Sequence, residues 1–124
     1  MKKALLTLPF LMILFASSAF AQDSEPLGKV FWRGMVDDRL QLVIKGDKLE
    51  HKTISGQTNP DGVYSFTSPL PEQAVIVSVN KQKGRSKQVK VIQQPAEDNG
   101  FTAIIEIYDN GGGAKEYQLE ISWK

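Results

Sequence analysis

The chain has 124 residues, with 15 basic and 14 acidic side chains, one histidine and no cysteine. Such a balance gives no electrostatic reason to expect a nucleic acid or an anionic membrane as the partner. The lack of cysteine excludes disulfides and thiolate-bound metals, so the fold must be stabilised by the packing of its core.

The first 21 residues have the pattern of a cleaved secretory signal peptide. Two lysines follow the initial methionine, residues 4–15 are almost wholly apolar, and Ala19-Phe20-Ala21 supplies the small residues that a signal peptidase reads. An uncleaved membrane anchor is the alternative, but the apolar run is short for a bilayer span and contains Pro9. We therefore expect export to the periplasm or the extracellular space, and no integral membrane segment after cleavage.

Beyond residue 21 the sequence predicts a single domain. Removal of the signal peptide leaves 103 residues, 13 of them basic and 14 acidic, which is the usual length of one compact domain. Residues 22–28 are mostly polar, and we expect them to form a flexible lead-in. Residues 29–124 would then be the folded part.

The first half of this domain reads as four short strands, because apolar and polar side chains alternate in each of them. They are residues 29–36, 40–44, 48–54 and 63–67. In the first strand, Val30 and Trp32 share the face that we expect to be buried. Gly46-Asp47 is typical of a two-residue hairpin loop and places Leu42 opposite His51.

The second half predicts two hairpins. One joins residues 73–82 to residues 87–94, and its facing apolar residues are Val75, Val77 and Val79 on one strand and Val89 and Val91 on the other. The second joins residues 101–109 to residues 114–123 through Asn110 and three glycines. Its expected cross-strand pairs are Phe101 with Trp123, Ala103 with Ile121, Ile105 with Leu119 and Ile107 with Tyr117. A slip of one residue would turn this apolar row outward, so the register is well specified.

Together these segments predict an all-β domain, an antiparallel β-sandwich of about seven to eight short strands. A small barrel is the alternative. The sandwich is favoured because the connections over residues 55–62 and 68–72 allow strands to change sheet. No part of the domain sustains the apolar spacing of a helix.

Part of the domain resembles a known family. The segments Asn59-Pro-Asp-Gly-Val-Tyr-Ser-Phe, Leu70-Pro71 and Val77-Ser-Val79 follow the turn–Gly–x–Tyr–x–Phe, Leu–Pro and Val–x–Val run of carboxypeptidase-regulatory-like domains. The similarity covers about residues 55–91 and does not extend to the first strand. Because those domains are transthyretin-like β-sandwiches, the resemblance implies the same fold class and no particular ligand.

The inventory of reactive side chains argues against an enzyme. A nucleophile needs a positioned base, most often histidine, and His51 is expected to be a half-buried or edge residue beside Leu49. One histidine without cysteine cannot form a zinc site, and no acidic loop has the spacing of a calcium site. We expect no catalytic residue, no metal and no cofactor.

Two groups of residues are candidates for partner binding. Five apolar side chains have the outward parity of their strands, namely Phe31, Ile76, Ile92, Ile104 and Tyr108. If two or more of them share one sheet face, they form an apolar patch of the kind that marks an interface, unless a loop or the lead-in covers them. The second group is basic and surrounds the tip of the first of the two later hairpins; it contains Lys81, Lys83, Arg85, Lys87 and Lys90.

These observations predict an exported, non-enzymatic binding or structural module. It would recognise a protein or a cell-surface polymer through the apolar residues, with the basic tip assisting. The alternative is a carbohydrate-binding module that uses the basic tip, above all for anionic glycans. Salt separates the two hypotheses, because it screens contacts between exposed charges.

Overall fold

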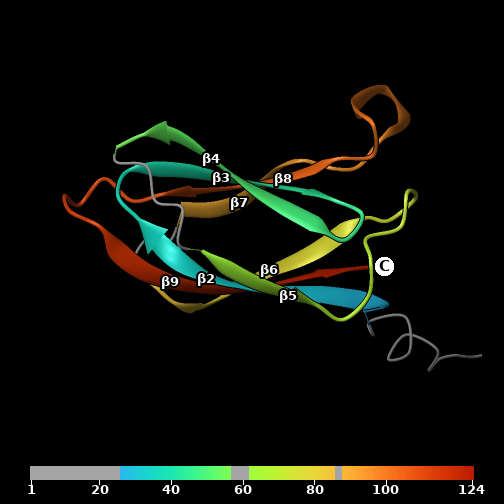
Figure 1. Ribbon diagram of the computed structural model, residues 1–124, viewed down its shortest axis with the longest axis horizontal. Helices are drawn as coiled ribbons and strands as arrows, with labels where there is room; N and C mark the ends of the chain where they lie inside the picture. Colours follow the sequence, from blue (N-terminus) through green and yellow to red (C-terminus); the bar gives the residue numbers. More distant parts are fainter. Residues whose placement is uncertain (1–25, 57–61, 86–87) are drawn as a thin grey trace, which may run out of the picture.

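Figure 1 shows the computed structural model of the chain, in which residues 26–56, 62–85 and 88–124 are described. The signal peptide predicted for residues 1–21 lies outside these ranges. Across the described ranges, no helix is long and apolar enough to cross a membrane.

Two antiparallel sheets of four strands pack face to face, which confirms the predicted all-β fold class (Figure 1). One sheet has the order β5-β2-β9-β6 and the other the order β4-β3-β8-β7. The strands are β2 (Gly28–Val36), β3 (Arg39–Lys45), β4 (Lys48–Ser55), β5 (Val63–Phe66), β6 (Ile76–Lys83), β7 (Gln88–Gln93), β8 (Ala103–Tyr108) and β9 (Lys115–Trp123). A short 3₁₀ turn, Glu97–Asn99, precedes β8.

The predicted hairpin between the last two strands is wrong. Strand β8 pairs with β3 and β7, whereas β9 pairs with β2 and β6, so the two strands lie in different sheets. Their apolar rows are nevertheless among the most deeply buried of the described residues, at 0–1% exposure from Ala103 to Trp123. Both rows point inward because they face each other across the sandwich rather than along one ladder.

The hairpin predicted for residues 73–94 is wrong for the same reason, since β6 and β7 also belong to different sheets. By contrast, the β3–β4 hairpin is confirmed, with Leu42 opposite His51 and Ile44 opposite Leu49. Gly46 in its loop has a φ of 61°, a conformation that glycine adopts without strain.

Both tryptophans lie in the core, as expected. Trp32 and Trp123 are among the largest fully buried side chains. Phe101, expected opposite Trp123, instead precedes β8 with a φ of 59° and is only partly buried. Trp123, at the buried end of β9, instead packs near Phe66, and the centres of the two rings are 6.2 Å apart.

The connection from β5 to β6 crosses from one edge of its sheet to the other edge of the same sheet. The expectation that this connection changes sheet is therefore wrong. Leu70 within it is buried, and its N–H donates to the carbonyl of Gly46 at 2.8 Å. The connection over residues 55–62 does join different sheets, as predicted. The lead-in ends earlier than predicted, because Gly28 belongs to β2 and the N–H of Leu27 donates to the Trp123 carbonyl.

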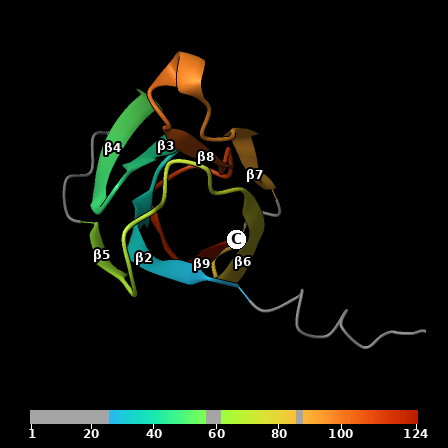
Figure 2. The same ribbon diagram turned by 90° about the vertical axis from the view of Figure 1, so that its right-hand side faces the viewer.

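The end view in Figure 2 shows that each side of the sandwich brings two edge strands of different sheets near each other. One side has β4 and β5, and the other has β6 and β7. We call these sides the β4–β5 seam and the β6–β7 seam.

Candidate functional site

The five apolar residues predicted to lie outward do not form one surface. Phe31 is 40% exposed on the outer face of the β5-β2-β9-β6 sheet. Ile92 is 43% exposed, and it lies on the other sheet together with the partly buried Ile104 and Tyr108. Ile76 is only 4% exposed and belongs to the core, so its predicted exposure is wrong.

A β-bulge in β6 explains the position of Ile76. Ile76 pairs with Trp123 while Ser78 pairs with Ser122, so β6 advances two residues where β9 advances one. The extra residue reverses the alternation, which leaves Val77 exposed and brings Val79 back to the core.

Polar side chains occupy the outer face on which Ile104 and Tyr108 lie. The guanidinium of Arg39 sits 4.3 Å from the centre of the Tyr108 ring, a cation–π contact. Glu106, which lies between Ile104 and Tyr108 on β8, is nearly buried and accepts a hydrogen bond of 3.0 Å from Gln41 Nε2. This face is therefore a packed polar layer rather than an apolar patch.

Two residues of the predicted basic cluster form ion pairs. Lys83 Nζ lies 2.7 Å from Glu116 Oε1, and Arg85 binds the buried carboxylate of Asp109. Lys90 stands opposite Glu106 in the β7–β8 ladder, and Lys81 stands opposite Leu119 in the β6–β9 ladder. Lys87 lies outside the described residues.

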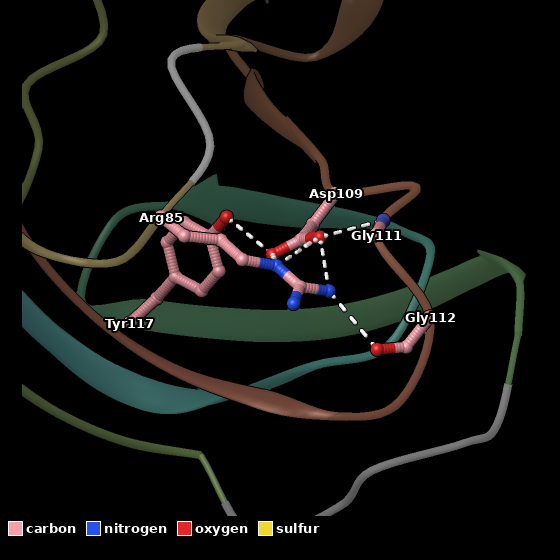
Figure 3. A network of polar contacts seen from close by, with 5 residues as sticks. All are labelled: Arg85, Asp109, Gly111, Gly112 and Tyr117. Carbon is pink, nitrogen blue, oxygen red and sulfur yellow. Dashed lines mark hydrogen bonds and ion pairs between the residues drawn. The ribbon is translucent and has the colours of Figure 1, made fainter.

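Arg85 belongs to a network that ties the β6–β7 seam to the end of the sandwich (Figure 3). Its Nε donates to both oxygens of Asp109, at 2.8 and 3.0 Å, and its Nη2 donates to the carbonyl of Gly112 at 3.0 Å. Asp109 also accepts from the Tyr117 hydroxyl at 2.7 Å and from the Gly111 N–H at 3.0 Å. Arg85 thus acts as a clamp between two connections, because its donors bind Asp109 and Gly112 although its side chain is 38% exposed.

The bonds to Asp109 offset the cost of burying its charge. Burial raises the pKa of Asp109, but hydrogen bonds from Tyr117, Gly111 and Arg85 outweigh that effect and leave the pKa below its usual value. Gly84 leaves room for the network, since a Cβ at that position would collide with the Tyr117 ring.

At its other end, the β6–β7 seam is closed by a side-chain amide. Gln94 Oε1 accepts from the N–H of Ile76 at 2.7 Å, and Gln94 Nε2 donates to the carbonyl of Ile76 at 3.0 Å. The amide thus makes the two bonds that a neighbouring strand would make to that residue.

One hollow on the outer face of the β5-β2-β9-β6 sheet contains a predicted site residue. It has a volume of about 330 Å³ and is lined by Phe31, an exposed aromatic residue on an inner strand of the sheet. Its other outward-facing lining residues are Arg33, Val63, Ser65, Gln82 and Gln118. Sequence reasoning found Phe31 and missed these neighbours, because strands distant in the sequence bring them together.

Charges of both signs surround the hollow. Gln82 Nε2 donates to Glu120 at 3.0 Å, and Lys29 forms an ion pair with the same carboxylate at 2.8 Å. On the other side of the hollow, the hydrogen bond and charge of Lys83 hold the pKa of Glu116 below its usual value, and Arg33 adds to this effect. The surroundings of Phe31 are therefore polar but nearly balanced in charge.

The β4–β5 seam contains the single histidine. Trp32 Nε1 donates to His51 Nε2 at 2.7 Å, which connects the two sheets. His51 is partly buried on an edge strand, as predicted.

Within the described ranges, no three histidine, aspartate or glutamate side chains are grouped so that they could hold a metal ion. No protein-family model matches the sequence, and comparisons with curated proteins and with solved structures find no match.

Proposed function

We propose that the protein is an exported, non-enzymatic binding module that recognises a protein or cell-surface partner through the hollow around Phe31. The observation that supports it is the exposure of Phe31 on an inner strand of a sheet, where strand alternation calls for a polar residue. A large aromatic side chain of this kind acts as an anchor when a partner covers it.

The surroundings of Phe31 suit a partner that combines apolar and polar contacts. Val63 extends the apolar surface beside Phe31, and it is 52% exposed. Arg33, Gln82 and Gln118 around them provide donors and acceptors that would orient the partner. Apolar centres with polar rims are typical of protein interfaces.

The test compares Phe31 with an apolar residue of similar exposure on the opposite sheet. Phe31→Ser should abolish chemical crosslinking of the protein to its partner in the intact cell envelope, whereas Ile92→Ser should leave it unchanged. Circular dichroism should show that both variants are folded. Capture by Phe31→Ser at the wild-type level, or equal loss in both variants, would contradict the proposal.

A carbohydrate is the second candidate for the partner. An exposed aromatic ring beside the planar amides of Gln82 and Gln118 could stack on a sugar and bind its hydroxyls. Gel electrophoresis in the presence of neutral or acidic polysaccharides tests it. If Phe31→Ser abolishes the retardation and salt does not, the result favours stacking at the hollow. If salt abolishes the retardation, the result favours binding by the basic tip.

A further inference from the structure

The contact between Trp32 and His51 joins two strands that share no ladder. The two strands are β2, which carries Trp32, and β4, which carries His51. Strands β4 and β5 are edge strands of different sheets, as Figure 2 shows; β4 pairs with β3, and β5 pairs with β2. The bond from Trp32 Nε1 to His51 Nε2 therefore connects β2, the neighbour of β5, directly to β4. The two rings lie 5.8 Å apart and are tilted by 46°.

This bond requires one protonation state of His51. An indole nitrogen can only donate, so Nε2 of His51 must be the unprotonated nitrogen and Nδ1 must carry the proton. Protonation of Nε2 would place two N–H groups against each other. The bond cannot survive that change without movement of one ring.

On one side the bond is closely packed. Trp32 is only 2% exposed, and a Cβ on Gly62 would collide with both Trp32 Nε1 and His51 Nε2. Gly62 immediately precedes β5. Movement of either ring toward Gly62 therefore displaces the chain at the start of β5.

Within the part of the chain that the structure describes, the neighbouring strands direct no charge toward His51. Its partner on β3 is Leu42, and the inward rows of β2 and β3 carry no titratable residue. Among the described residues on the inward rows of the four adjoining strands, Tyr64 on β5 is the one other titratable group. Glu50 and Lys52 flank His51 on β4 but have the opposite parity. Burial lowers the pKa of His51, in agreement with this apolar setting.

We propose that mild acid opens the β4–β5 seam by protonating His51, which breaks its bond to Trp32 and loosens β5. Strand β5 is the shortest of the eight described strands and pairs with β2 alone, so it has the fewest other contacts to hold it. The inference concerns the fold itself and does not depend on the proposed binding function.

The composition of the chain makes the test simple, because it has one histidine and two tryptophans. In a ¹H–¹⁵N spectrum of the folded protein, each tryptophan gives one indole cross-peak. Between pH about 7.5 and 4.5 the Trp32 peak should shift or broaden together with the His51 ring signals, with a midpoint below 6.5. The Trp123 indole, which is buried without a hydrogen-bond partner, is the internal control and should not follow that titration.

Hydrogen exchange measures the opening itself. After correction for the intrinsic effect of pH, protection of the β5 amides should fall by up to about tenfold per pH unit between pH about 6.5 and the His51 midpoint, and should change little below that midpoint. In His51→Gln, whose amide oxygen can accept from Trp32 but cannot be protonated in this range, protection should not change. Titration of His51 without a change at Trp32 or in β5 would overturn the proposal, as would a His51 midpoint at or above 6.5.

Discussion

The β4–β5 and β6–β7 seams occupy equivalent places in the sandwich, yet different groups close them. The β6–β7 seam is tied at one end by the carboxylate of Asp109 with its ionic and neutral donors, and at the other by the amide of Gln94. The side-chain bond across the β4–β5 seam joins two neutral rings, Trp32 and His51. The β6–β7 seam therefore depends on the charged carboxylate of Asp109, whereas the β4–β5 seam depends on His51 being neutral.

Removal of the buried charge should have the largest effect. Asp109→Ala leaves Arg85, the Tyr117 hydroxyl and the Gly111 N–H without their acceptor. Because the Arg85 side chain is 38% exposed and water can hydrate it, we expect the loss of unfolding free energy to be that of buried hydrogen bonds to a charged group, about 1.5–3 kcal/mol. The loss of unfolding free energy is measured by urea unfolding. Asp109→Asn keeps an acceptor and should lose less, while Lys83→Ala, which breaks an exposed pair, should change little. A loss in Asp109→Ala no larger than in Lys83→Ala would mean that the network does not hold the seam.

The two tryptophans allow the bond in the β4–β5 seam to be measured. Replacement of either by phenylalanine removes similar ring volume, but only Trp32→Phe removes a hydrogen bond and leaves His51 Nε2 without its donor. We expect Trp32→Phe to be more destabilising than Trp123→Phe by about 1–2 kcal/mol. Equal losses in urea unfolding would show that the bond to His51 contributes little.

As the pH falls, the β4–β5 seam should weaken first and the β6–β7 seam second. His51 has a folded-state pKa below its ordinary value of 6.5, so the unfolded chain binds the proton more readily and stability falls as the pH drops below that value. The pKa of Asp109 also lies below its ordinary value of 3.8, so its contribution is kept at pH 5 and is lost only in stronger acid.

Urea unfolding of the wild type and of His51→Gln at pH about 7, 5 and 2.5 checks this order. The first loss should be absent in His51→Gln, whereas the second should occur in both proteins. A single loss confined to the lowest pH would remove the difference between the seams.

The period of two in the sequence was sufficient to predict the strands and most of the core. It could not show which strands pair, because an apolar row on β8 can face a row on β9 either across a hairpin or across the sandwich. The bulge that turns Ile76 inward depends on its pairing with β9, a strand about 40 residues later in the chain. Alternation within β6 alone contains no sign of it.

The candidate site was harder to predict for a related reason. Exposure of Phe31 follows from its parity on one strand, and that prediction was correct. The engagement of Arg85 with Asp109 and the position of Val63 beside Phe31 depend on contacts between distant strands. The sequence therefore predicted a basic group around a hairpin tip, although the Arg85 guanidinium is bound to Asp109.

The pair of bonds from Gln94 to Ile76 has a consequence for how copies of this protein behave when they are concentrated. Edge strands can recruit a strand from another molecule through their unpaired backbone groups, which leads to aggregation. Here the Gln94 amide already occupies the outward backbone groups of Ile76, and irregular pairing in β6 and β7 bends that side further. Self-association by strand addition should therefore begin elsewhere, at edges such as β4, which has a longer regular stretch.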